Sequence, residues 1–308
     1  MALNLGRFEP YAQKARALIS AEPVRIAVAG ADDDDTLLSA TICANEFGVK
    51  LSLFGTGEKI RRLATQGGYC LDGMDVIDAP SGPASAGMAT SLVSSGKADI
   101  LMKGQVKTSD FMRAVLNAET GLRTGRTLSH VGGFDMPGFD RVLFVTDGGI
   151  NVAPDLKTKI DIVQNAIEMV NGLGYREPRV ACLAAVETVN PDMPITTDAA
   201  AIAKMADRGQ IKGALIDGPL ALDTAVSPVA CEQKGVRGPV AGHADVLVVP
   251  NLECGNLMAK GMLYFGAAIM AGIVVGARKP VILNSRADTA ENKAASLALA
   301  VLLVRRGV

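Results

Sequence analysis

Short runs rich in Val, Ile and Leu recur along the chain, and within each run the apolar residues are continuous instead of alternating with polar ones. Runs of this kind are typical of strands covered on both faces, as in a mostly parallel sheet between layers of helices. The sequence predicts such strands at Arg25–Ala29, Lys50–Phe54, Asp75–Asp78, Ile100–Lys103, Val142–Thr146, Arg179–Ala184, Ala214–Ile216, Val246–Val249 and Val281–Asn284.

Amphipathic stretches with helical spacing separate these runs. The clearest are Thr36–Phe47, Ala84–Ser95, Asp155–Leu173, Asp198–Arg208 and Thr289–Val304. Regular alternation of strands and helices predicts the α/β class. Asp32–Asp35 is the one charge run, and we expect Asp35 to cap the helix that follows, because acids favour the N-terminal end of a helix dipole.

Composition narrows the possible partners. The chain has 308 residues, which suggests two domains, and its 31 Lys and Arg balance 32 Asp and Glu. A net charge of −1 argues against a nucleic-acid partner or an anionic membrane surface. The apolar stretch Met262–Val275 is too short to span a bilayer. We expect a protein without a membrane partner, whose bound anions are held by a few local cations.

Five cysteines lie far apart and lack the spacing of a zinc site. We therefore expect reduced thiols, a cytoplasmic location and no bound metal. Cys254 alone lies in a polar loop after a predicted strand, although packing explains it equally well.

The strongest candidate for chemistry follows the last predicted strand. Ser285 and Arg286 lie between that strand and a helix, whose start is indicated by Asp288 and Glu291 at capping-box spacing. A hydroxyl, a guanidinium and helix N-terminal amides together suit a phosphate or carboxylate. A structural turn in which the arginine pairs with a nearby acid remains the alternative.

A second candidate follows the strand that ends at Lys103. Here Gly104 is expected to free backbone amides beside the Lys103 ammonium, and Thr108 or Ser109 to cap the next helix. The segment lacks the Walker A pattern, so it predicts an anion contact without predicting a nucleotide triphosphate site.

Three further strand ends carry polar side chains. Asn151 follows a Gly-Gly pair and can bind a ligand or form an Asx turn. Asp217 and Glu253 are each expected to open a helix and are candidate bases, although acids at helix starts are common. Asn256 lies in the same helix start as Glu253.

The chain has two histidines. His130 lies in a polar, Gly-rich segment with Arg126 and Ser129, which makes ligand contact and simple exposure equally reasonable, whereas His243 precedes a strand and is expected to be exposed. Gly55-Thr-Gly57 resembles half of a dinucleotide fingerprint, but Ile60 replaces its third glycine. Neither a nucleophile elbow nor a full dinucleotide motif is present.

Long segments of the sequence carry a family resemblance. They include AGADDDDTLLSA, ADILMKGQVKT, LSHVGGFDMPGFDRVLFVTDGGINVAPDLKTKIDIVQNAI, ACLAAVETVNPDMPITTDAAAIAKMADRGQIKGALIDGPLALDTAVS and ADVLVVPNLECGNLMAKGMLYFGAAIMAGIVVGARKPVILNSRAD. Together they cover nearly the whole chain, which resembles the phosphate acetyltransferase/phosphate butyryltransferase family, most closely its butyryltransferase branch.

The resemblance implies reversible transfer of a short-chain acyl group, acetyl or butyryl, between coenzyme A and phosphate. Coenzyme A would be a substrate, and no cofactor would be tightly bound. It also implies an isocitrate-dehydrogenase-like fold of two doubly wound α/β domains, with residues 151–276 inserted into a domain formed by 1–150 and 277–308. The active site would lie in a cleft between them, and the enzyme would be a homodimer or a higher homo-oligomer.

The resemblance also implies roles for individual residues. Ser285 and Arg286 match a family pair that acts on phosphate and the carbonyl group; Lys103, Gly104 and Thr108 match a binding loop; and Arg126 or His130, near Ser129, matches a family cation. The remaining binding candidates are Asn151, Asp217 and Asn256.

One position departs from the family pattern. The acetyltransferase branch has an acid in its final helix, and Asn292 is the better match to it, so Glu291 is the substitute catalytic candidate. This departure keeps open a non-catalytic acyl-CoA-binding module as an alternative. The fold itself keeps open a second alternative, a metal- or NAD-dependent dehydrogenase of the same fold.

Overall fold

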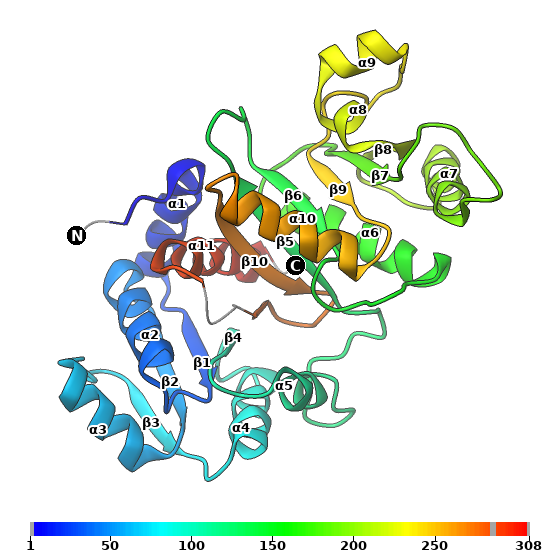
Figure 1. Ribbon diagram of the computed structural model, residues 1–308. Coiled ribbons are helices and arrows are strands. Elements are labelled where there is room, and N and C mark those ends of the chain that lie inside the picture. Colours follow the sequence, from blue (N-terminus) through cyan, green and yellow to red (C-terminus); the bar gives the residue numbers. More distant parts are fainter. Residues whose placement is uncertain (1–2, 284–287, 307–308) are drawn as a thin grey trace. The chain divides into compact units, whose positions relative to one another are not determined.

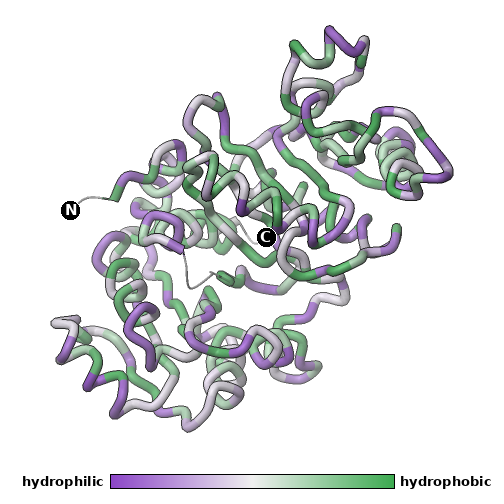
Figure 2. The backbone as a smooth tube through the Cα atoms, viewed as in Figure 1, coloured by the Kyte–Doolittle hydropathy of each residue, from purple (hydrophilic) through white to green (hydrophobic). Residues whose placement is uncertain are grey.

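The computed structural model describes residues 3–283 and 288–306. The chain divides into two compact units, Met1–Arg126 with Ala271–Val308, and Thr127–Met270 (Figure 1). The strands are largely hydrophobic along their length, while loops and outer helical faces are mixed (Figure 2). This is the pattern that continuous apolar runs predict for a sheet covered by helices.

The first unit alternates strands and helices. In chain order it contains η1 (Gly6–Phe8), α1 (Glu9–Ala21), β1 (Arg25–Ala29), α2 (Asp34–Phe47), β2 (Lys50–Gly55), α3 (Gly57–Gly67), β3 (Asp75–Asp78), α4 (Gly82–Ser94), β4 (Ile100–Lys103), α5 (Thr108–Val115), the greater part of β10 (Ile269–Val275), β11 (Val281–Ile282) and α11 (Ala290–Arg306).

Its strands follow the order β3-β2-β1-β4-β11-β10. The first five run parallel, and β10 is antiparallel to β11. Residues Ile26–Ala29 of β1 are fully buried at the centre of this sheet. Helix α4 packs on β1 and β2, while α11 packs on α1 and α2. The order reverses direction between β1 and β4, which is where open α/β sheets usually bind ligands.

The second unit contains β5 (Ser129–Asp135), β6 (Leu143–Thr146), α6 (Leu156–Gly172), β7 (Arg179–Leu183), α7 (Pro194–Asp207), β8 (Leu215–Leu220), α8 (Leu222–Val226), α9 (Pro228–Lys234), β9 (Val246–Val248) and α10 (Leu252–Tyr264). Its strand order is β5-β6-β9-β7-β8. The β5–β6 pair is antiparallel and the others are parallel. Phe134, Leu143, Ala181 and Leu247 belong to its buried core.

The predicted α/β class and the mostly parallel pairing are confirmed. The sequence did not reveal two strands, β5 and β10. Each of them runs antiparallel to a neighbouring strand that was predicted, β6 and β11 respectively. β5 is interrupted by Gly132 and Gly133, which have low strand propensity and weaken its pattern. The apolar run of β10 follows α10 almost directly. The hydrophobic pattern therefore joins the end of the helix and the strand into one stretch from Met262.

One predicted helix cap differs in detail. Asp33, and not Asp35, caps α2 by accepting a hydrogen bond from the Thr36 amide at 3.0 Å. Asp155 caps α6 at the expected helix start. At the start of α11, the Thr289 hydroxyl accepts from the Asn292 amide at 3.3 Å.

The division into units differs from the expected domains in two places. Residues 127–150 lie with the second unit, and residues 271–276 lie with the first. The first difference arises because β6 pairs with β9 of the second unit on one side and with β5 on the other. No helix among the described residues is long and apolar enough to cross a membrane.

Candidate functional site

Lys103 is the last residue of β4, and its half-buried side chain lies at the carboxyl edge of the first unit's sheet. The Lys103 Nζ donates to the Gly104 carbonyl at 3.2 Å. β11 runs parallel beside β4, with Ile282 level with Met102. β11 therefore ends at the same edge of the sheet as Lys103. Ser285 and Arg286 themselves lie outside the described residues.

The amides around Gly104 are already used. The Gly104 amide donates to the Ala29 carbonyl at 2.7 Å, and the Gln105 amide donates to the Gly30 carbonyl at 2.8 Å. A side chain at Gly104 would place its Cβ 2.5 Å from the Gly30 oxygen. The expectation that Gly104 frees amides for an anion is therefore wrong. Glycine is required because the loops after β1 and β4 are in backbone contact across the switch point.

The remaining candidates of the first unit lie at helix starts. Thr108 is exposed as the first residue of α5, and no side chain caps that helix, contrary to the prediction for Thr108 or Ser109. In the first turn of α11, Glu291 is half-buried and Asn292 is buried. Of the two residues near the family's acid, Glu291 is thus the more accessible one.

In the second unit, one buried carboxylate organises the loop after β6. Asp147 is 3% exposed. Its Oδ1 accepts from the amides of Gly149 at 2.9 Å and Ile150 at 3.0 Å. Its Oδ2 accepts from the amide of Asn151 at 3.1 Å and from the Asn151 side chain at 2.6 Å. These four hydrogen bonds to one carboxylate fix residues 148–151 in one conformation.

This loop holds the start of β5. The Asn151 Nδ2 also donates to the Leu128 carbonyl at 2.8 Å. The Thr146 hydroxyl donates to the His130 carbonyl at 2.9 Å. The His130 side chain occupies the space beside Gly149, where an added Cβ would lie 3.1 Å from its Cβ and Cγ. The structure thus brings His130 and Asn151 together. The Asn151 side chain has a structural role as a donor to Asp147 and Leu128, which differs from the Asx-turn alternative.

Helix α6 fixes the preceding residues. Asn165 donates to the Thr127 carbonyl at 2.8 Å and to the Ser129 hydroxyl at 3.1 Å. Ser129 is fully buried. It therefore cannot contact a ligand in this conformation, which corrects its expected binding role. Arg126, one residue before this anchored segment, is exposed.

Asn256 joins the same group from α10. Its Nδ2 approaches the Gly148 carbonyl at 3.5 Å, at the weak limit of a hydrogen bond. Gly148 and Gly255 are in backbone contact, since a Cβ on Gly255 would lie 2.6 Å from the Gly148 Cα. Glycine is therefore required at both positions, because the start of α10 packs directly on the loop after β6.

Asp217 lies apart from this group. It lies inside β8, so the expectation that it opens a helix is wrong. β9 and β7 separate β8 from β6 in the sheet. Burial raises the pKa of Asp217, although its carboxylate also accepts from the Gly218 amide at 2.8 Å. The structure therefore does not bring Asp217 together with Asn151 and His130.

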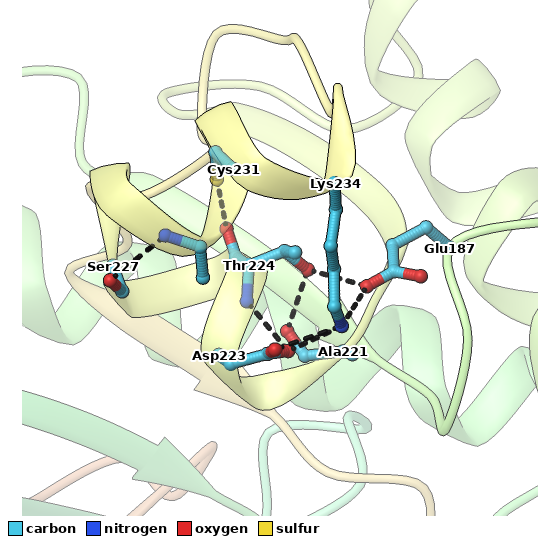
Figure 3. Close-up of polar contacts among 8 residues, drawn as sticks. Glu187, Ala221, Asp223, Thr224, Ser227, Cys231 and Lys234 are labelled. Carbon is cyan, nitrogen blue, oxygen red and sulfur yellow. Dashed lines mark hydrogen bonds and ion pairs between the residues drawn. The ribbon is translucent and has the colours of Figure 1, made fainter.

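The sequence also did not reveal a polar cluster around α8 and α9 (Figure 3). Lys234 of α9 bridges Glu187, at 3.1 Å, and Asp223, at 2.8 Å. The Thr224 hydroxyl donates to Glu187, and the Cys231 thiol donates to the Thr224 carbonyl. Glu187 is far from the others in sequence, so no local pattern could have indicated it. The cluster ties the loop after β7 to α8 and α9.

Comparisons with known proteins decide the family. Residues 84–301 match the family described as phosphate acetyl/butaryl transferase. The phosphate butyryltransferase of Clostridium acetobutylicum is 47% identical over 285 residues, which cover 92% of this chain and 94% of that protein. The phosphate acetyltransferase of Rhizobium meliloti is 44% identical over 291 residues, which cover 94% and 92%. The chain belongs to this family.

Solved structures agree with this assignment. A branched-chain phosphotransacylase from Enterococcus faecalis superposes with a TM-score of 0.82 at 33% identity, covering 91% of this chain and 99% of that one. A 4-hydroxythreonine-4-phosphate dehydrogenase from Klebsiella pneumoniae shares only the fold, with a TM-score of 0.56 at 15% identity, covering 92% and 100%. The protein is therefore an enzyme, a phosphate acyltransferase of acetyl or butyryl type, and its fold is shared with dehydrogenases.

Proposed function

We propose that this enzyme transfers a short-chain acyl group, acetyl or butyryl, reversibly between coenzyme A and inorganic phosphate. The observation that carries the proposal is identity of 44–47% with named phosphate acetyl- and butyryltransferases over more than nine-tenths of the chain. The Klebsiella dehydrogenase that shares the fold is only 15% identical, far below these transferases. Coenzyme A acts as a substrate in this proposal, and no cofactor needs to be tightly bound.

The chemistry assigns different tasks to the two groups of residues. The acyl phosphate carbonyl must be polarised and the departing phosphate stabilised, and both need donors or cations in a site sheltered from water. We assign these tasks to Ser285, Arg286 and Lys103, because β11 and β4 end at the same edge of the sheet. Thr108 and Glu291 are further members of this group.

We assign binding of coenzyme A to residues of the second unit and to the residue that directly precedes it in the chain. These are Arg126, His130, Asn151 and Asn256, which lie close to the ordered loop after β6 or to the anchored segment before β5. Asp217 is a more distant candidate for the same substrate. Its support is the raised pKa that burial gives its carboxyl group.

The direct test is an assay of thiol release. Purified enzyme is mixed with phosphate and with acetyl-, propionyl- or butyryl-CoA, and rates are compared along this series. We expect turnover with at least one of them, and an Arg286→Ala variant should lose at least about 100-fold in kcat/KM, because the phosphate loses a bidentate partner. Arg62→Ala removes an exposed arginine from α3 and serves as the control. Turnover of none of the three, or equal rates for Arg286→Ala and wild type, would refute the proposal.

We further propose that the enzyme is a cytoplasmic homodimer or higher homo-oligomer. All five cysteines are unpaired in the structure, which fits a reducing compartment. Large apolar side chains are exposed on and just after α10, with Leu257 at 71%, Tyr264 at 70% and Phe265 at 95%. Clustered exposed apolar residues of this size are typical of protein interfaces.

A further inference from the structure

We propose that His130 is the general base that removes the proton from the coenzyme A thiol, and that Asp147 is the positioning residue that holds the loop against it. This inference rests on the proposed function and assigns one of its steps. It also answers the question raised by Asn292, since an amide at the position of the family's acid cannot accept a proton.

The first argument is chemical. A thiol has an ordinary pKa near 8.5, and a base that works at neutral pH should have a pKa close to that pH. Histidine is the side chain whose ordinary pKa meets this condition. The chain has two histidines, so the choice is narrow.

The second argument is position in the sheet. His130 is the second residue of β5, which runs antiparallel to β6, with Val131 paired to Thr146. It therefore lies at the carboxyl edge of β6, the edge that binds ligands in α/β folds. His243 is exposed before β9 begins at Val246, at the opposite edge of the parallel strands. Only His130 is on the functional side.

The third argument is the precision with which the neighbourhood of His130 is built. Its carbonyl accepts from the Thr146 hydroxyl, and the Leu128 carbonyl accepts from Asn151. Its side chain lies against Gly149, whose amide donates to Asp147 at 2.9 Å. A buried carboxylate that receives four hydrogen bonds is costly to leave unpaired, so the loop has one stable arrangement.

The side chain remains accessible within this frame. His130 is partly exposed, while Ser129 beside it is fully buried. The carboxylates carried by the elements that pack on this end of β5 are Asp147, after β6, and Asp161, on α6. Both are held by backbone amides, Asp147 by those of Gly149 and Ile150 and Asp161 by that of Thr127.

The step balances without a further reactant. A ring nitrogen of His130 takes the proton as the S–H bond breaks, and the sulfur electron pair forms a bond to the carbonyl carbon of the acyl phosphate. The bond between that carbon and the phosphate oxygen then breaks, and phosphate leaves with the electron pair. In the reverse direction the protonated imidazole returns the proton to the departing thiolate.

The test begins with kinetics. We expect His130→Gln to reduce kcat/KM for acyl transfer by about 10²- to 10⁴-fold and to remove the fall in kcat/KM at acid pH. His243→Gln, at the opposite edge, should keep the wild-type rate and pH profile. A wild-type enzyme that turns over no acyl-CoA would refute the proposed function before any variant is compared. A His130→Gln enzyme with the wild-type rate and pH profile would refute this inference alone.

Nuclear magnetic resonance supplies an independent measurement. Two histidines give two imidazole Cε1–H signals, and His243→Gln assigns them. Coenzyme A should shift the His130 signal and leave that of His243 in place. Asp147→Asn should change the pH midpoint of the His130 signal and not that of His243, a selectivity that general destabilisation would not produce. Equal shifts at both histidines, or none at His130, would overturn the assignment.

Discussion

Gly104 shows how a single residue keeps the loops after β1 and β4 in contact. We predict that Gly104→Ala destabilises the enzyme by about 1–3 kcal/mol, because the added methyl group would lie 2.5 Å from the Gly30 oxygen and from Thr36 Cγ2. In a protein of this size, each kcal/mol corresponds to roughly 2–4 °C in the thermal midpoint.

Gly87 is the matched control, since nothing lies within 4 Å of its Cβ position inside α4. Gly87→Ala should be neutral or stabilising by up to about 1 kcal/mol. Equal midpoints for the two variants would contradict the steric explanation.

Thiol reactivity should follow burial. Burial raises the pKa of Cys43 and of Cys182 to about 12, so both remain protonated at pH 8, whereas Cys70 and Cys254 are exposed. We predict that iodoacetamide at pH 8 modifies Cys70 and Cys254 in the folded enzyme, and that Cys43 and Cys182 react only after unfolding. Peptide mass spectrometry before and after denaturant reads this directly. Labelling of Cys43 at the rate of Cys70 in the folded enzyme would show that α2 opens.

At the residue scale, the sequence indicated which strand ends carry polar side chains better than it indicated the partners of those side chains. The polar residues at the ends of β4 and β6 were identified from chain position alone. Their partners were not, because Asp147 binds amides two to four residues ahead while Asn165 reaches back 36 and 38 residues. Hydrogen bonds between residues so far apart in the sequence produce no periodic pattern. The sequence therefore predicts a ligand contact at Ser129, whereas the structure shows Ser129 buried and bonded to Asn165.

At the scale of elements, the outcome depended on strand type. Buried parallel strands have continuous apolar runs, and these predicted β1, β2 and β4 to within one residue. The antiparallel β5 was not predicted, because its two glycines break the run and its pairing with β6 is set by tertiary contacts. The polar edge strand β8 was predicted too short, since Asp217 and Pro219 read as a turn.

The clamp between the loop after β7 and α8–α9 supports a pH-dependent prediction. Burial alone would raise the pKa of Glu187, but hydrogen bonds from Lys234 and Thr224 outweigh it and hold that pKa below its usual range. A carboxyl group whose pKa is depressed on folding contributes stability above its unfolded pKa and loses it as pH falls through the folded value.

We therefore expect Glu187→Gln to lower the urea midpoint at pH 7 and to have a smaller effect at pH 3, because the wild-type ion pair loses strength as pH falls toward the folded pKa of Glu187. Urea unfolding at both pH values measures the difference. The effect should be modest and should shrink with added salt, because the ion pair is partly exposed. A larger difference at pH 3 than at pH 7 would reverse the sign and remove the ion pair as the cause. Glu232→Gln, on an exposed position of the same helix α9, is the control.

At the scale of the whole molecule, α10 and the residue after it leave large apolar side chains exposed to solvent. Among its residues from Leu252 to Tyr264, only Gly255 is fully buried, yet the helix is rich in Leu and Met. Its inner side packs Met258 and Met262 on the core of the second unit. The outer side leaves Leu257, Tyr264 and Phe265 exposed. An isolated monomer gains nothing from three large apolar side chains in water, so this surface supports the proposed homo-oligomer.

We predict that Phe265→Asp shifts the enzyme from a dimer or higher oligomer toward a monomer, because a carboxylate in an apolar interface loses its hydration without gaining a partner. Light scattering after size-exclusion chromatography, over a range of protein concentrations, measures the mass directly. Val229→Asp is the matched control, because Val229 is 62% exposed on α9 and lies outside this surface. If the wild-type enzyme is already a monomer at every concentration, the exposed residues of α10 have another use. If Phe265→Asp keeps the wild-type mass, the subunits associate through a different surface.

Dissociation with the Phe265 variant alone would place the subunit contact on α10. This is the helix whose first turn contacts Gly148 through Gly255 and Asn256. Assembly would then bear on the same loop that holds His130, and activity should fall with protein concentration in the variant and not in the control.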